Sequence, residues 1–383
     1  MVARATPRAA RWSGACCPRG ATLCRVSGIV SFVPGPAHVR EEVLRAMAVA
    51  PAPHRGPQIR ALVGRVQAQL RTLLGTEAPV FPVLASGTAA LEAALCALGR
   101  QRALVVVTGA FGARLAKVAA ATGLEVETLT VPPGRVAAPD AVAHALDAAP
   151  FDVVAVVHNE TQTGALADVV AIAREVAARP GVALVVDAVS SFAGVELRLD
   201  DLAPETVLVS VTGKALACPP GVSIVAVSEA AAERARGAVR GGYALRLESL
   251  VASARREETP QTPSIPLLHA LGAQLPRILD EGLAARAARH GELATTVRAW
   301  AERRFAVLAE PECRSPTVTT VENTTGLDVA TLLAAVERRG FRIANGYAEL
   351  RGATFRIGHM GDVTREETDG LLAALDAALD EIG

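Results

Sequence analysis

An aspartate and a lysine stand at the ends of two short apolar runs. Asp187 directly follows Val182–Val186. Val207–Val211 leads into Lys214 three residues later. Both runs are short and rich in β-branched residues, which is typical of buried strands. Because open α/β sheets bind their ligands at strand ends, a carboxylate and an amine at these positions indicate a reactive site.

The lysine is unusual because this chain uses arginine almost everywhere else. Of 39 basic residues only Lys117 and Lys214 are lysines, which leaves 37 arginines. Arginine can replace lysine on a solvated surface, but it cannot condense with a carbonyl compound as a primary amine does. Chance retention of two lysines is the alternative, and Lys117 fits it because it lies among Ala and Leu at helical spacing. Lys214 is therefore the candidate nucleophile.

Two motifs around these residues resemble those of the class V aminotransferases. They are Val-Asp-Ala-Val-Ser-Ser-Phe at 186–192 and Lys-Ala-Leu-Ala-Cys-Pro-Pro-Gly from Lys214. The similarity runs from about Phe32 to the C-terminus. The family consists of fold-type I enzymes that use pyridoxal 5′-phosphate (PLP), and this chain is most similar to its alanine/serine–glyoxylate and 2-aminoethylphosphonate–pyruvate transaminases. The resemblance implies an α/β fold with a large, mostly parallel central-sheet domain and a smaller C-terminal α/β domain.

The resemblance gives Lys214 and Asp187 complementary roles. Lys214 would hold the cofactor aldehyde covalently and, once released, would move a proton during the reaction. Asp187 would face the pyridine nitrogen of PLP. The ring withdraws electrons only while that nitrogen is protonated, and a carboxylate beside it keeps the proton in place.

Three residues at a strand-to-helix turn match the family's phosphate site. Val80–Leu84 is predicted to be a strand, and an amphipathic helix follows it. Ser86, Gly87 and Thr88 open that helix. Unpaired backbone amides and the positive end of a helix dipole attract a phosphate group. The alternative is a plain N-cap, because Ser-Gly-Thr is a common sequence. The position of this turn ahead of Asp187, as in the family, favours cofactor binding.

Phe111 and Thr161 follow two further predicted strands, Ala103–Val107 and Val153–Val157. The resemblance implies that Phe111 stacks on the pyridine ring. It also implies that the Thr161 hydroxyl binds the phenolic oxygen of the cofactor. An ordinary core phenylalanine is the alternative at position 111. The neighbouring Glu160 is interpreted as structural.

Arg356 is the predicted substrate-binding residue. Alternation along a strand puts Phe355 and Ile357 on one face and Arg356 on the other, so that the guanidinium can point into a cleft. The resemblance implies that Arg356 binds the substrate carboxylate, a task suited to its bidentate fork. A surface arginine is the alternative.

Thr262 and Gly213 bear on how the phosphate is held. In the family, a hydroxyl at the Thr262 position binds the phosphate of the partner subunit's cofactor, which implies a homodimer with sites at its interface. Many members have glutamine where this chain has Gly213. The missing phosphate contact must then come from backbone groups, from Thr212 or from the partner subunit.

Length and composition fit a globular protein that can bury a large core. The chain has 383 residues, of which 51% are hydrophobic, and 39 acidic residues balance 39 basic ones. This balance argues against a nucleic-acid partner and against an anionic membrane surface. No apolar run approaches the ~18 residues of a membrane span. The six cysteines lack metal-site spacing, so we expect no metal and a reduced, cytoplasmic protein.

The chain is predicted to divide into three parts. Residues 1–30 are rich in arginine and contain no Asp or Glu, and we expect them to be a disordered leader, with a transit peptide as the alternative. Residues 31–270 would form the large PLP-binding domain, with an N-terminal segment that contacts the small domain. Residues 271–383 would form the small C-terminal domain. A single helical stretch over 267–303 is expected to link the two.

The expected activity is transfer of an amino group from a small amino acid, alanine or serine, to glyoxylate or pyruvate. Transamination of 2-aminoethylphosphonate with pyruvate is the first alternative, and its acceptor would still engage Arg356. A PLP lyase of the cysteine desulfurase type needs a reactive thiol, for which Cys313 is the only candidate. A non-catalytic binding protein would leave Lys214 and Asp187 without a purpose.

Overall fold

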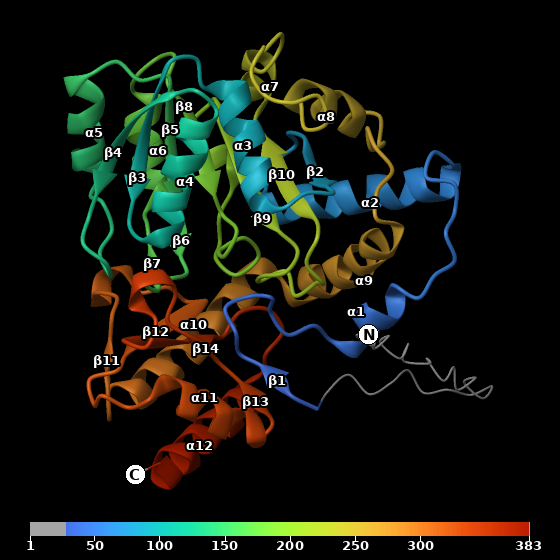
Figure 1. Ribbon diagram of the computed structural model, residues 1–383. Helices are drawn as coiled ribbons and strands as arrows, with labels where there is room; N and C mark the ends of the chain where they lie inside the picture. Colours follow the sequence, from blue (N-terminus) through green and yellow to red (C-terminus); the bar gives the residue numbers. More distant parts are fainter. Residues whose placement is uncertain (1–27, 383) are drawn as a thin grey trace, which may run out of the picture.

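The structure is a computed structural model that describes residues 28–382. It consists of a larger upper part and a smaller lower part in Figure 1, each built on its own sheet. Residues 1–27 of the predicted leader lie outside the described residues. Val30 belongs to strand β1 (Val30–Ser31), so regular structure begins inside the stretch predicted as a disordered leader.

A seven-stranded sheet organises the larger part and confirms the predicted fold class. Its strand order is β2-β10-β9-β8-β5-β3-β4. β10 is antiparallel to both of its neighbours and the other pairs are parallel, so six of the seven strands run in one direction. The strands are β2 (Val80–Val83), β3 (Arg102–Val107), β4 (Glu125–Thr130), β5 (Val153–Val157), β8 (Ala183–Asp187), β9 (Thr206–Val211) and β10 (Ser223–Val227).

Residues of each strand alternate between two apolar cores, because successive side chains point to opposite faces of the sheet. In β5, Val154 and Val156 pack into one core, while Val153, Ala155 and Val157 pack into the other. Burial of both faces explains why these strands are continuous apolar runs in the sequence.

Helices cover both faces of this sheet, as Figure 1 shows. The first core is closed by α1 (Glu41–Ala46), α2 (Pro57–Leu74), α5 (Pro139–Ala148), α6 (Val169–Ala177) and α9 (Ile265–Glu281). The second core is closed by α3 (Gly87–Leu98), α4 (Ala110–Ala121), α7 (Glu229–Arg234) and α8 (Leu247–Ala254). No described helix is long and apolar enough to cross a membrane.

The smaller part contains an antiparallel sheet of order β11-β12-β15-β14. Its core includes Trp300, Phe355 and Leu371. The strands are β11 (Ala306–Val307), β12 (Val318–Glu322), β14 (Ala344–Asn345) and β15 (Thr354–Gly358), with β13 (Phe341–Arg342) beside them. The helices are α10 (Leu283–Ala301), α11 (Val329–Arg338) and α12 (Arg365–Ile382).

Two helices occupy the stretch predicted as one. α9 ends at Gly282, whose φ of 78° interrupts the helical path, and α10 begins at the next residue. α9 packs into the core of the seven-stranded sheet, whereas α10 packs into the core of the smaller part. The division of the chain at 270/271 stays a prediction.

An N-terminal strap, defined as residues 30–40, touches both parts. Its first strand, β1, pairs in parallel with β13 of the smaller part, and Figure 1 shows β1 in blue beside the orange-red C-terminal elements. Farther along the strap, the amide of Ala37 donates to the carbonyl of Gly213 in the larger part at 2.9 Å. The strap therefore joins the two sheets at the level of the loop after β9.

Short elements complete the described chain. A hairpin follows β5, and three 3-10 turns lie in loops. These are β6 (Asn159–Glu160), β7 (Ala165–Leu166), and the 3-10 turns Leu199–Asp201, Pro311–Cys313 and Ala348–Leu350.

Candidate active site

The chemically active residues meet at one edge of the seven-stranded sheet. Asp187 is the last residue of β8, and it pairs with Val157 of β5 on one side and Val209 of β9 on the other. Because these three strands are parallel neighbours, the loops that carry Thr161 and Lys214 leave the sheet beside Asp187. The sequence predicted this meeting from strand ends alone, and the structure contains it.

Asp187 is a buried carboxylate with one backbone anchor. Its side chain accepts a hydrogen bond from the amide of Val189 at 2.9 Å, and the residue is 7% exposed. Burial raises the pKa of Asp187 to about 6, against the opposing effects of that hydrogen bond and of the positive charges of Lys214 and Arg114. A nearby positive charge would stabilise the ionised form of this carboxylate, because their attraction would offset the free-energy cost of desolvation.

Lys214 is a half-buried residue whose amine holds its proton weakly. Its Nζ donates to the carbonyl of Pro34 in the strap. Burial, together with the positive charge of the nearby Arg356, lowers the pKa of Lys214 to about 8, although Asp187 partly offsets both effects. A side chain at Gly35, where φ is 123°, would collide with Nζ. The strap can pass over the amine only because glycine stands there.

Two polar side chains of the loop after β5 fix the start of α4. Gly109 supplies no side-chain cap to this helix. Instead Glu160 accepts from the amides of Phe111 at 3.0 Å and Gly112 at 3.1 Å, and Gln162 accepts from the amide of Ala110 at 2.6 Å. Glu160 is fully buried, and burial raises its pKa to about 7. It acts as the helix cap, in agreement with its structural interpretation.

Phe111 lines the same cavity as Asp187 and is backed by a tyrosine that the sequence did not single out. Its ring stacks on Tyr347, with ring centroids 5.2 Å apart and planes 13° from parallel. The guanidinium of Arg114 lies 5.2 Å from the Phe111 centroid and 5.9 Å from that of Tyr347. A shared cation makes this stack a fixed aromatic wall. The sequence predicts stacking of Phe111 on the cofactor, with a core phenylalanine as the alternative, and neither interpretation includes Tyr347.

Arg356 and Thr161 lie together, as the predicted roles require. Arg356 donates from Nε to the carbonyl of Asn345 at 3.0 Å and from Nη1 to the carbonyl of Thr161 at 3.3 Å. Its guanidinium also lies 5.6 Å from the Tyr347 centroid. The Thr161 hydroxyl is within 2.9 Å of the Ser190 hydroxyl. The arginine is thus preoriented through three groups, while its remaining N–H groups stay available to a carboxylate.

The turn before α3 has the geometry expected of an anion site. Ser86 caps the helix by accepting from the amide of Ala89 at 3.2 Å, which matches the plain N-cap alternative. Its hydroxyl proton remains free, so capping does not exclude a second role. A Cβ at Gly87 would lie 3.1 Å from methyl groups of Val189 and Val211, so the turn packs closely on the loops after β8 and β9.

A cavity of about 220 Å³ joins this turn to the carboxylate. Gly87, Thr88, Phe111, Asp187 and Val189 are among the residues that line it. The positive end of α3, the Phe111 ring and the carboxylate therefore face one space. This space suits a flat ring with a basic nitrogen at one end and a phosphate at another, which is the shape of the predicted cofactor.

The surroundings of Thr212 and Gly213 show whether this loop can replace the phosphate contact of the family's glutamine. The Thr212 hydroxyl donates to the carbonyl of Pro219 at 2.7 Å, which uses its single proton and leaves none for a phosphate oxygen. A Cβ at Gly213 would lie 3.1 Å from the Cβ of Pro220, so a larger residue would press on that proline. Within the protomer, the turn before α3 therefore remains the candidate phosphate site.

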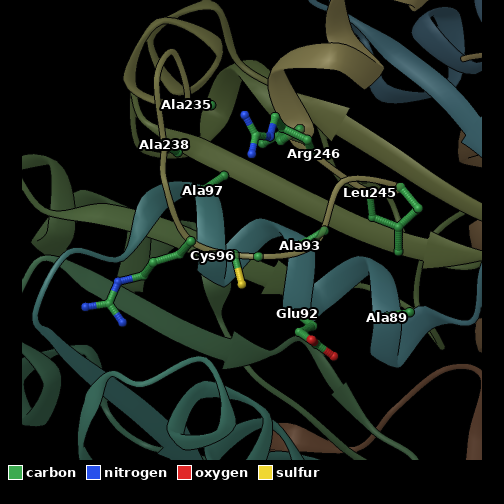
Figure 2. A pocket seen from close by; sticks show the side chains of 14 residues that line it. Ala89, Glu92, Ala93, Cys96, Ala97, Ala235, Ala238, Leu245 and Arg246 are labelled. Atoms are coloured by element: carbon green, nitrogen blue, oxygen red, sulfur yellow. The ribbon is translucent and has the colours of Figure 1, made fainter.

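Thr262 lies in a different cavity from Asp187. It is exposed, and it lines a surface hollow together with Leu84, which is itself 56% exposed. Another cavity, of about 280 Å³, lies between α3 and residues 235–247. Figure 2 shows its lining of alanines, with Cys96, Glu92 and Arg246 at its sides and no predicted site residue.

The family of the chain follows from its sequence match. Residues 38–366 match the model of the family described as aminotransferase class-V. The chain belongs to the class V aminotransferases. It is therefore a PLP-dependent transaminase, and the predicted family, enzyme class and cofactor are confirmed.

Three relatives of this aminotransferase cover nearly all of it. It is 34% identical over 363 residues to an uncharacterized aminotransferase of Methanocaldococcus jannaschii, covering 92% of this chain and 93% of that protein. It is 30% identical to a serine–glyoxylate aminotransferase of Methylorubrum extorquens, covering 92% and 91%. A crystal structure of an alanine–glyoxylate aminotransferase from Nostoc sp. superposes with a TM-score of 0.84 at 31% identity, covering 94% and 97%.

Proposed function

We propose that this aminotransferase moves the amino group of a small amino acid, alanine or serine, to glyoxylate or pyruvate. The observation that carries the proposal is the half-buried Lys214, whose amine is close enough to both Asp187 and Arg356 for their charges to shift its pKa. The relatives named for serine, alanine and glyoxylate support the substrate class.

We assign the chemistry of the site residue by residue. PLP supplies an electron-withdrawing ring when bound. Asp187 holds the proton of the ring nitrogen, and this cationic partner offsets the desolvation that raises its own pKa. The Lys214 amine would hold the cofactor through its aldehyde and, once released, would move a proton at the substrate α-carbon. Its lowered pKa leaves an appreciable neutral fraction near pH 8, which both tasks need.

Cofactor and substrate contacts follow from the same geometry. We propose that Ser86, Gly87 and Thr88 bind the phosphate, that Phe111 stacks on the ring, and that the Thr161 hydroxyl binds the phenolic oxygen. Arg356 binds the substrate carboxylate. Its bonds to the carbonyls of Asn345 and Thr161 preorganise it for that task.

We propose a homodimer in which Thr262 reaches the partner subunit's cofactor phosphate. Thr262 is exposed next to Leu84, and exposed apolar residues continue along this side with Tyr243, which is 91% exposed. An exposed apolar surface of this kind suits an interface between subunits. We place the enzyme in the cytoplasm because the described cysteines are free thiols.

The test is a set of half-reactions on the PLP-saturated enzyme. Single amino acids are added, and loss of the visible cofactor band reports conversion to the aminated cofactor; glyoxylate or pyruvate should then restore the band. We expect L-serine or L-alanine to convert the wild type and the Lys117→Ala control, but not Lys214→Ala. Conversion by 2-aminoethylphosphonate alone would replace this proposal with the phosphonate alternative. Sulfide release from cysteine without conversion would identify a lyase.

A further inference from the structure

An arginine-rich cavity lies away from the Asp187 cavity, where the strap, α9, α10 and the start of α12 meet. It measures about 290 Å³. Its charged lining consists of five arginines and two acids: Arg40, Arg277, Arg286, Arg289, Arg365, Glu281 and Asp362. The chain as a whole is formally neutral, so this concentration of positive charge is a local departure.

The two acids of this cavity are already engaged by the two innermost arginines. Arg286, 2% exposed, donates to Glu281 at 2.7 Å and to Asp362 at 2.8 Å. Arg289 donates to Glu281 at 2.6 Å and to the carbonyl of Val363 at 2.9 Å. Burial alone would raise the pKa of Asp362, but the pairing with Arg286 holds it below its usual range. Asp362 also forms an ion pair with Arg40 at 3.4 Å, and neither carboxylate pairs with Arg277 or Arg365 in the described part of the chain.

The other three arginines keep unused donors. Arg40 donates from one Nη to the backbone of Asp362, while its buried Nε has no hydrogen-bond partner and lies 3.4 Å from an Asp362 oxygen. Arg277 makes no hydrogen bond or ion pair with any described residue. Arg365 binds only Asp369, an exposed residue one turn further along α12. Three guanidinium groups with free N–H donors thus line one hollow.

The first turn of α12 adds a further positive end to this hollow. The helix has 18 residues, and Thr364, directly before it, lines the cavity. Glu367 of the first turn folds back to accept from the amide of Thr364 at 2.7 Å, and so closes a capping box. The remaining first-turn amides have no acceptor inside the helix.

We propose that this cavity is a binding site for a small dianion of the phosphate type, either free phosphate or the phosphate group of a metabolite. Planar guanidinium forks bind phosphate oxygens in pairs, and several converging forks together with a helix start favour a dianion. Without a ligand, the clustered positive charges repel one another; a bound dianion removes that repulsion.

A dianion in this cavity would act on the reaction centre through two contacts. Arg40 belongs to the strap, whose Pro34 carbonyl accepts from Lys214. Arg286 donates to the carbonyl of Ala215, the residue after Lys214, at 2.8 Å. The ligand would therefore hold the strap and the Lys214 loop in one arrangement. This proposal concerns binding by the folded chain and does not rest on the choice of amino donor.

The experiment is equilibrium dialysis of radiolabelled inorganic phosphate against PLP-saturated enzyme at low ionic strength. Because the cofactor already occupies its own phosphate site, added phosphate reports further sites. We expect one site per chain, weakened at least tenfold in the double variant Arg277→Gln/Arg365→Gln. The matched control is Arg236→Gln/Arg303→Gln, two arginines whose side chains are each 61% exposed elsewhere on the surface, and it should bind as the wild type does.

Three results would overturn the proposal. They are absence of phosphate binding by the wild type, equal binding by the Arg277→Gln/Arg365→Gln variant, and loss of binding in Arg356→Gln alone, which would place phosphate at the substrate site. Transamination without phosphate should be unchanged in the double variant. The two proposals can therefore fail separately. A negative transaminase assay would not change the phosphate binding measured by dialysis, and absence of phosphate binding would not change the transaminase assay.

Discussion

Two buried clusters of charge in this enzyme behave in opposite ways. At the strand ends, Asp187 is buried and Lys214 is half-buried, each with few partners, and their pKa values move toward neutrality, to about 6 and about 8. Where the strap meets α10, Arg286 and Asp362 are both buried, yet they form a 2.8 Å ion pair, and this pairing holds the pKa of Asp362 below its usual range.

The difference lies in pairing. Burial raises the desolvation free energy of every charged group, but a close ion-pair partner and further hydrogen bonds offset most of it. Arg286 uses its Nε and both Nη atoms, whereas Lys214 has only one backbone carbonyl. Deep burial without pairing yields groups that exchange protons near neutral pH, and deep burial with pairing yields fixed charges that hold elements together.

The largest expected effect is at Lys214. Lys214→Arg keeps the positive charge but removes the condensable amine, so transamination should fall by at least about 10⁴-fold. Lys117→Arg is the matched control and should leave the rate unchanged. Steady-state assays with serine and glyoxylate measure both variants. Activity of Lys214→Arg within tenfold of the wild type would refute the role of the amine.

The second prediction contrasts the two carboxylates. Asp362→Asn leaves buried Arg286 short of a counter-charge and should lower the free energy of unfolding by about 3 kcal/mol. Asp187→Asn removes a poorly compensated charge, so apoprotein stability at pH 8 should stay the same or rise, while transamination should fall by about 10²-fold or more. Urea unfolding of the apoproteins and rate assays separate the two. Equal destabilisation would remove the distinction between the clusters.

The third prediction concerns pH. Only the neutral amine attacks the cofactor aldehyde, and burial lowers the pKa of Lys214 from 10.5 to about 8. Covalent uptake of PLP by the apoenzyme should therefore rise with pH around a midpoint near 8. Arg356→Gln removes a positive neighbour, so the midpoint should move upward. Absorbance after mixing at a series of pH values gives the midpoint. A midpoint near 10.5 in the wild type would show an ordinary, solvated lysine.

The smallest expected effect is at Tyr347. Tyr347→Phe keeps the stack on Phe111 and loses only the hydroxyl that accepts from Arg114, so kcat/KM should change by less than about threefold. Tyr347→Ala removes the ring beside Arg356 and should raise KM for the 2-oxo acid by about tenfold. Similar kinetics for the two variants would show that the ring does not orient Arg356.

The strands and their ends could be predicted from the sequence. Val153–Val157 is the same in prediction and structure, because a strand buried on both faces must be apolar throughout. Parallel neighbours then bring Asp187 and Lys214 to one edge. The break at Gly282 was missed, although a glycine directly after Asp280 and Glu281 is a usual helix end.

Other parts of the site have no local signal. Tyr347 lies in a loop without periodicity, next to Ala348 at a φ of 52°, and its contact with Phe111 joins distant segments. The bond from Lys214 to Pro34 spans 180 positions of the chain. Thr212 was a reasonable phosphate donor until the fold placed its hydroxyl against Pro219. Such contacts depend on tertiary packing, and they cannot be predicted from the type and local spacing of the residues alone.

The strap makes the beginning of the described chain indispensable. Residues 30–40 supply a strand partner to β13, a carbonyl that accepts a hydrogen bond from the Lys214 amine, and one wall of the arginine-rich cavity. A shortened polypeptide that starts after Ser31 would lose the strand, and one that starts after Arg40 would lose all three functions together. Affinity tags and fusion partners for this enzyme are therefore best attached ahead of Gly28.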